Sequence, residues 1–193
     1  RVPLCKPDVG EEEIRAIREV FAAGNLSHGS SVASFEEVFA RLVGTKHAVA
    51  ANSWTSAAFL VCCYLRERYG VGEVLMPSFT FVASANTVAS AGLTPRFADV
   101  DESTQEVTAE TLSPHINSHT LAIMPVHYAG RPCHMPSIME LARKHDLAVI
   151  EDSAECLGAR VGKKQAGSFD IGIFSFYATK NITTGEGGMV TTD

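Results

Sequence analysis

The stretch "IGIFSFYATKNITTGEGGMVTT", residues 171–192, places one lysine directly after a largely apolar run. Its first seven residues predict a buried strand, so Lys180 lies just past the end of core structure. Small hydroxylated residues surround this lysine, and three glycines follow it at positions 185, 187 and 188. Because folds present chemical groups on the loops that follow rigid elements, Lys180 is a candidate functional residue.

Upstream of this stretch, strand-like and helical patterns alternate along the chain. Apolar residues at helical spacing predict helices, and short apolar runs between turn signals predict strands. The expected helices cover residues 10–24, 31–44, 52–70, 81–92 and 136–146, and the expected strands cover residues 46–51, 73–77, 95–100, 121–127, 147–153, 171–177 and 187–192. This alternation predicts an α/β fold with a doubly wound, mostly parallel sheet.

Composition and charge narrow the range of functions. The 193 residues are enough for one domain with a substantial core. A formal net charge of -6, without a basic stripe, argues against a nucleic acid or an anionic membrane as partner. The sequence shows no apolar run of membrane-spanning length and no signal peptide, and its five scattered cysteines are typical of reduced thiols. We therefore expect a cytoplasmic protein.

Four strand ends carry side chains with distinct chemistry, and ligands of such sheets bind beyond the carboxyl ends of the strands. They supply an anion site of helix N–H groups and hydroxyls at residues 52–56, an aromatic ring at Phe81, a carboxylate at Asp152 and an amine at Lys180. Pyridoxal 5'-phosphate needs all four, for its phosphate, its ring face, its pyridine nitrogen and its aldehyde. The sequence therefore predicts a site for this cofactor.

Each of these residues also has a structural explanation when it is considered alone. Ser53 could cap a helix, Phe81 could belong to the core, Asp152 could cap a turn, and Lys180 could be a solvated lysine. The cofactor prediction depends on all four features occurring together at strand ends.

Three stretches carry a resemblance to a known family: "PSFTFVASANTVASAGLTPRFADVD" at 77–101, "EDSAECLGA" at 151–159 and "GSFDIGIFSFYATKNITTGEGGMVTT" at 167–192. They resemble the sugar aminotransferases of the DegT/DnrJ/EryC1/StrS family, within the aspartate-aminotransferase-like, fold type I superfamily. By that resemblance Lys180 forms the Schiff base with the cofactor, and Asp152 pairs with its ring nitrogen. The resemblance assigns the remaining cofactor contacts to Thr55, Ser56 and Ser175 at the phosphate and to Phe81 on the ring.

The chain departs from the family pattern in two respects. Glu155 stands where the family usually has a glutamine or histidine that contacts the phenolic oxygen of the cofactor, and a carboxylate there would repel that oxygen unless it is protonated or paired with a cation. The family also has a smaller C-terminal domain after the strand at 187–192. We therefore expect residues 1–193 to form a cofactor-binding large domain, the N-terminal part of a longer enzyme.

The resemblance implies a homodimeric enzyme that transfers an amino group, usually from glutamate, to a nucleotide-linked keto-sugar in amino-sugar or polysaccharide biosynthesis. Two alternatives stay open. One is a related sugar dehydratase, in which histidine replaces the lysine, and the other is a non-catalytic, cofactor-binding sensor or remnant. No metal site is predicted, because His127, Cys133 and His134 lack the spacing of paired ligands. His127 could instead lie near the cofactor or serve the structure.

Overall fold

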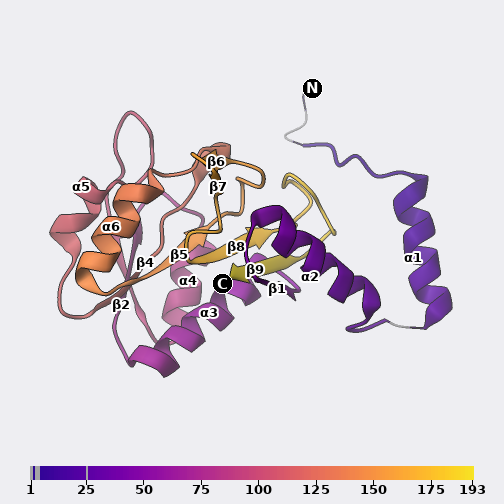
Figure 1. Cartoon of the computed structure of the whole chain (residues 1–193), viewed down its shortest axis with the longest axis horizontal. Helices are drawn as coiled ribbons and strands as arrows, with labels where there is room; N and C mark the ends of the chain where they lie inside the picture. Colours follow the sequence, from indigo (N-terminus) through magenta and orange to yellow (C-terminus); the bar gives the residue numbers. More distant parts are fainter. Residues whose placement is uncertain (1, 3–4, 25) are drawn as a thin grey trace.

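The computed structural model describes residues 2, 5–24 and 26–193, and within these ranges its centre is a seven-stranded sheet (Figure 1). The order of strands is β1 (His47–Ala51), β9 (Gly188–Thr192), β8 (Ile171–Ser175), β5 (Ala148–Asp152), β4 (Thr120–Ile123), β2 (Glu73–Pro77) and β3 (Thr94–Ala98). The strands from β8 to β3 are parallel, whereas β9 runs antiparallel to both of its neighbours, β8 and β1. The predicted mostly parallel sheet is confirmed.

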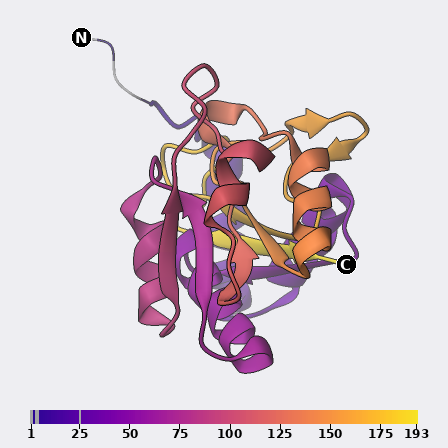
Figure 2. The same cartoon turned by 90° about the vertical axis from the view of Figure 1, so that its left-hand side faces the viewer.

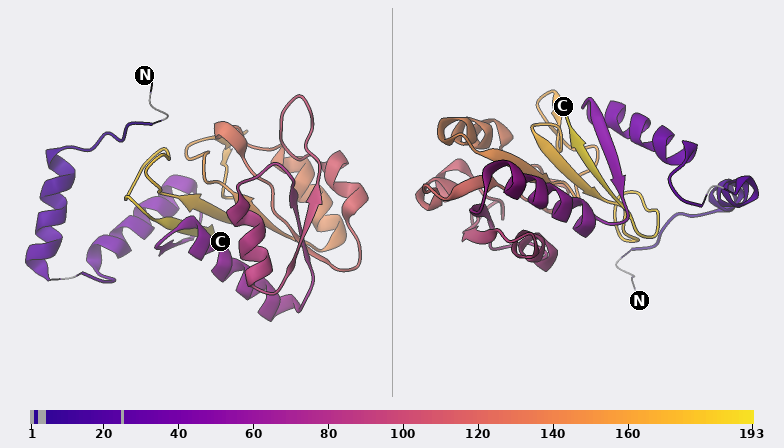
Figure 3. Two further views of the ribbon diagram at one scale, coloured as in Figure 1. Left: turned by 180° about the vertical axis from the view of Figure 1, so that it is seen from behind. Right: turned by 90° about the horizontal axis from the view of Figure 1, so that it is seen from below.

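Both faces of the sheet are buried under helices (Figures 2 and 3). Along β2, Val74 and Met76 pack on one side with α3 (Trp54–Tyr69) and α4 (Val82–Ser90), whereas Leu75 packs on the other with α5 (Ala109–Leu112) and α6 (Met135–His145). Ile150 and Val149 of β5 divide in the same way. This alternation along one strand is the period-two pattern of a sheet covered on both faces, as the doubly wound prediction requires.

A third core lies where α2 (Ser30–Val43) meets β8 and β9. Phe39 and Val43 of the helix pack against Phe174, Phe176 and Met189, and Phe39 meets Phe174 edge to face with ring centroids 5.0 Å apart. The aromatic residues of the stretch at 171–177 therefore anchor the strand that precedes Lys180.

Helix ends follow the predicted signals. Gly24 and Gly44 end α1 (Glu11–Ala23) and α2 in the left-handed conformation, which glycine adopts without steric cost. The Ser53 side chain caps α3 by accepting from the Ser56 N–H. The strand predicted at residues 121–127 is shortened the most, since β4 ends at Ile123 and Pro125 has no N–H to continue the ladder. The chain nevertheless stays beside β5, because Asp152 N donates to Pro125 O at 2.9 Å.

The first helix stands apart from this body (Figures 1 and 3). α1 (Glu11–Ala23) forms where predicted, yet none of its residues is buried, and Ile17, Val20, Phe21 and Leu26 line an open groove beside it. Its apolar face is thus outside the cores described above. Within the described ranges no helix combines the length and hydropathy needed to cross a bilayer.

The remaining elements are short. A two-stranded hairpin joins β6 (Arg160–Val161) to β7 (Lys164–Gln165), and single 3-10 turns occur at η1 (Ser113–His115) and η2 (Tyr128–Gly130). The η2 turn follows the segment that lies beside β5, so it borders the carboxyl end of the sheet.

Candidate active site

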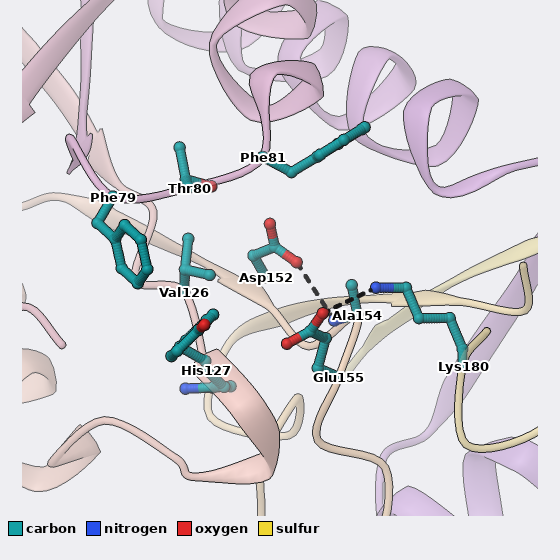
Figure 4. A pocket seen from close by; sticks show the side chains of 10 residues that line it. Phe79, Thr80, Phe81, Val126, His127, Asp152, Ala154, Glu155 and Lys180 are labelled. Atoms are coloured by element: carbon teal, nitrogen blue, oxygen red, sulfur yellow. Dashed lines mark hydrogen bonds and ion pairs between the residues drawn. The ribbon is translucent and has the colours of Figure 1, made fainter. Parts of the chain in front are cut away.

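The predicted strand-end residues gather at one edge of the sheet. Asp152 is the last residue of β5 and Ser175 the last of β8, and these two strands are parallel neighbours. Two cavities, of about 320 and 400 Å³, open at this edge. Both are lined by Phe81, Asp152, Ala154 and Lys180, so the ring, acid and amine that the sequence singled out border the same space. Figure 4 shows the smaller of the two cavities.

The larger cavity ends at the start of α3, where Ser53, Thr55 and Ser175 line it. Ser175 reaches this place because it pairs with Gly188 of β9, and β9 passes directly under the start of α3. A side chain at Gly188 would collide with the backbone of Ser53 and Trp54, so only glycine allows this approach. The helix start also offers N–H groups without intrahelical acceptors, which favour an anion.

Ser56 lies differently from the other predicted phosphate ligands. Its backbone N–H donates to Ser53 Oγ at 3.1 Å, and its side chain lines a separate groove between α3 and α4. The structural explanation for Ser53, a helix cap, is therefore correct, although Ser53 also lines the cavity.

Asp152 is a buried carboxylate with only 5% of its surface exposed. Its Oδ1 accepts from Ala154 N and its Oδ2 from Ser84 Oγ, each at 3.2 Å. Burial raises the pKa of Asp152 to about 6, against the opposing effect of these two hydrogen bonds. A carboxylate held in such a place is stabilised by a cationic partner, and the cavity has room for one.

Lys180 and Glu155 form an ion pair across the mouth of the smaller cavity (Figure 4). Lys180 Nζ donates to Glu155 Oε1 at 3.1 Å, and Glu155 Oε2 accepts from Ala129 N at 3.1 Å. Glu155 therefore has a cation beside it, which is the condition under which a carboxylate is tolerated at this position.

Phe81 precedes α4 and is 78% exposed, so the alternative of a core residue is wrong for it. Its side chain borders both cavities and leaves a flat face open. Phe79 and Tyr128, which meet at a ring-centroid distance of 4.8 Å, add a second aromatic wall to the smaller cavity. Tyr128 was not singled out from the sequence, and its place depends on the turn after β4.

His127 lines the smaller cavity but has a structural role. Its Nδ1 accepts from Cys133 N at 3.1 Å, so the ring proton of the neutral histidine is on Nε2, which lies 3.0 Å from Glu151 Oε2. Glu151 also accepts the backbone N–H groups of Gly167 and Phe169, and both members of the His127–Glu151 pair are buried. Among the described residues no cluster of acidic, histidine and cysteine side chains could hold a metal ion.

These groups fit pyridoxal 5'-phosphate in chemistry and in placement. The hydroxyls of Thr55 and Ser175 lie at one end, Phe81 offers a ring face, and the buried carboxylate and the lysine amine border the space between. Burial raises the pKa of Asp152, and a cationic ring nitrogen beside the carboxylate would oppose this rise and keep it ionised.

Comparisons with known proteins agree with this geometry. The sequence model of the DegT/DnrJ/EryC1/StrS aminotransferase family matches residues 7–193. The spore coat polysaccharide biosynthesis protein SpsC of Bacillus subtilis is 43% identical over all of this chain and 49% of its own length. The structure of PseC of Helicobacter pylori, an aminotransferase of pseudoaminic acid biosynthesis, matches with a TM-score of 0.93 at 34% identity, over 98% of this chain and 52% of that protein.

A dehydratase is among the similar structures. The E. coli GDP-4-keto-6-deoxy-D-mannose-3-dehydratase with bound hydrated PLP matches with a TM-score of 0.93 at 28% identity, over 100% of this chain and 51% of that one. The chain thus spans about half the length of each of these relatives.

Proposed function

The chain belongs to the DegT/DnrJ/EryC1/StrS aminotransferase family, and we propose that it forms the cofactor-binding domain of a pyridoxal-phosphate-dependent sugar aminotransferase. In this proposal the amino group comes from glutamate and is transferred to a keto-sugar carried on a nucleotide. The observation that carries the proposal is the convergence of Lys180 and Asp152 on the same two cavities, beside the exposed face of Phe81.

Each of these residues has a definite task. When bound, pyridoxal 5'-phosphate supplies an aldehyde that takes up and releases the amino group and a ring that withdraws electrons. Asp152 holds a proton at the ring nitrogen through its charge, and Lys180 supplies the amine that binds the cofactor and later moves a proton at Nζ. Thr55 and Ser175, with the N–H groups at the start of α3, bind the phosphate.

The substrate class is supported by what the relatives are named for. SpsC is named for spore coat polysaccharide biosynthesis and PseC for pseudoaminic acid biosynthesis, both of which concern carbohydrates. A nucleotide diphosphate and the carboxylates of the amino donor would both need cationic side chains to bind them. Among the described residues that line the two cavities, Lys180 is the one lysine or arginine. We propose that the active enzyme is a homodimer in which other parts of the protein complete the substrate site.

The dehydratase alternative is supported by the similarity to the E. coli enzyme. The lysine at position 180 supports aminotransfer instead, because dehydratases of this kind are expected to carry histidine there. A non-catalytic sensor would use the same cofactor contacts but would need no amine transfer.

Borohydride reduction tests the proposal directly. The full-length protein, purified with its cofactor, should after reduction and peptide mapping carry the cofactor on Lys180. Incubation with glutamate and a panel of nucleotide-linked keto-sugars should then yield an amino-sugar. A label on Lys163 or Lys164 would contradict the assignment, and a labelled Lys180 without any amine transfer would favour the sensor.

Removal of the Thr55 hydroxyl should weaken cofactor binding about tenfold or more. A hydrogen bond to a charged group contributes about 1.5–3 kcal/mol, and about 1.4 kcal/mol is tenfold in affinity. Thr55 is exposed, so Thr55→Ala should leave folding intact. Equilibrium titration of the cofactor-free, full-length protein measures the effect, with Thr55→Ser as the control that retains the hydroxyl. Equal affinity in wild type and Thr55→Ala would limit Thr55 to the first turn of the helix.

A further inference from the structure

We propose that Thr80 and Ser84 form a hydroxyl relay that positions Asp152 and keeps its carboxylate ionised beside the cavities. Nothing in the sequence pattern assigned a role to either residue. The inference rests on the proposed function of this site, but its geometry stands independently of any bound ligand.

Hydrogen bonding gives the relay a direction. Ser84 Oγ donates to Asp152 Oδ2 at 3.2 Å, and Thr80 Oγ1 lies 2.9 Å from Ser84 Oγ. A serine has a single hydroxyl hydrogen, so when Ser84 donates to Asp152 it can only accept from Thr80. The proton order therefore runs from Thr80 through Ser84 to the carboxylate.

The relay fixes one half of the carboxylate, and the backbone fixes the other. Oδ2 is held by Ser84, whereas Oδ1 accepts from Ala154 N at 3.2 Å. With a donor on each oxygen, the plane of the carboxylate is set before any ligand arrives, which is the pre-organisation that a cofactor partner requires.

Helix capping does not explain the two hydroxyls. The N-cap of α4 is Phe81, and no side chain caps the beginning of this helix. The hydroxyls of Thr80 and Ser84 are therefore not used for capping. Thr87 on the same helix behaves in the ordinary way, because its Oγ1 donates to the backbone carbonyls of Ala83 and Ser84. Only the hydroxyls at 80 and 84, four residues apart, are directed toward Asp152.

Electrostatics explain why hydroxyls matter at this place. α4 contains no charged side chain, so it faces Asp152 with neutral donors alone. The cation that favours the ionised carboxylate comes from elsewhere: it is Lys180 after β8, which is already paired with Glu155. His127 after β4 also lies on this side, but its Nδ1 accepts from Cys133 N, so the ring is neutral. Burial raises the pKa of Asp152, and the Ser84 hydrogen bond is one of the two that oppose this rise. Loss of the hydroxyl should therefore favour the protonated, uncharged acid.

The test uses the cofactor-free, full-length protein. Urea unfolding between pH 4.5 and pH 8.5 follows the ionisation of Asp152 through its effect on stability. Ser84→Ala should move the midpoint of this pH dependence upward by about one unit, and Thr80→Val should move it by a smaller amount. Thr80→Ser, which keeps the hydroxyl, should match wild type. In the cofactor-loaded enzyme, Ser84→Ala should lower amine transfer about tenfold or more at unchanged cofactor occupancy.

Controls separate the relay from general damage to α4. Thr87→Val removes a buried hydroxyl from the same helix and should leave the midpoint unchanged. Adding Asp152→Asn to either relay variant should abolish the shift, because the titrating group is gone. An unmoved midpoint in both Ser84→Ala and Thr80→Val, or an equal shift in Thr87→Val, would overturn the proposal. A shifted midpoint in a protein that transfers no amine would leave the relay standing and reject the proposed function.

Discussion

Asp152→Asn is expected to lower amine transfer by several orders of magnitude while the cofactor stays bound. Asparagine keeps the shape of the side chain and can still hydrogen-bond, but it has no charge with which to hold a proton at the ring nitrogen. Half-reaction kinetics with glutamate on the full-length protein measure the loss, and cofactor occupancy is measured alongside. Near-normal transfer at full occupancy would reject the role of Asp152.

The same substitution should have the opposite effect on the stability of the cofactor-free protein. The pKa of Asp152 is raised to about 6 in the folded protein, above the value near 4 of an unfolded chain. The folded state therefore binds more protons between these values, and stability falls by roughly 3 kcal/mol as pH rises through them. Asp152→Asn should remove this fall. Urea unfolding at pH 4.5 and pH 8 should show it, and a wild-type profile that is flat over this range would contradict the expectation.

Glu151 provides the matched control one position earlier on β5. Its carboxylate already accepts three hydrogen bonds, from His127, Gly167 and Phe169. Glu151→Gln would place an amide donor against at least one of these buried donors, so it should destabilise the fold by roughly 2–4 kcal/mol. Asp152→Asn should therefore raise the free energy of unfolding at pH 8, whereas Glu151→Gln should lower it. If β5 were merely sensitive to any substitution, both variants would lower it.

Lys180→Ala should abolish covalent attachment of the cofactor and reduce amine transfer to background. The methyl group has neither the amine that binds the aldehyde nor a proton to move at Nζ. Phosphate and ring contacts remain, so the variant should still bind the cofactor reversibly. The visible absorbance of the attached cofactor, mass spectrometry of the intact protein and transfer kinetics check these three statements.

A second substitution separates the charge of Lys180 from its chemistry. Lys180→Arg retains a cation beside Glu155 but cannot supply a neutral amine, so it should be as inactive as Lys180→Ala. Lys163→Ala, in the exposed hairpin between β6 and β7, should behave as wild type. Activity in Lys180→Arg would mean that Lys180 acts through its charge alone.

Strand ends were the part of the site that the sequence predicted well. Asp152 and Lys180 could be found because each follows an apolar run, and the carboxyl ends of parallel strands meet at one edge of a sheet. The fold class followed from the alternation of strand and helix patterns, which both buried faces of the sheet confirm. The family resemblance is confirmed by the match over residues 7–193.

Side chains that depend on tertiary contacts were out of reach. Ser84 looks like any small residue of a helix, and only the packing of α4 against β5 brings it to Asp152. The ion pair of Glu155 with Lys180 joins two loops, so the sequence could not show where its cation would come from. One feature of the sequence could have been used further. Successive residues of a strand face opposite sides of the sheet, so adjacent Glu151 and Asp152 could not both face the ligand, and one of them had to be buried on the other side.

The position of β9 has a consequence for how the protein folds. β1 lies at the edge of the sheet and pairs with β9 alone among the described strands. His47 therefore cannot form its strand pairing until its partner Thr192, far along the chain, is in place. The proposed anion site at the start of α3 is complete only when Gly188 lies beneath it and Ser175 beside it. Contacts of such sequence separation form late, because the entropy of closing the intervening chain has to be offset first. During synthesis, this end of the larger cavity is therefore assembled only after β9 has emerged, so any ligand that binds there has to follow the pairing of β8 with β9.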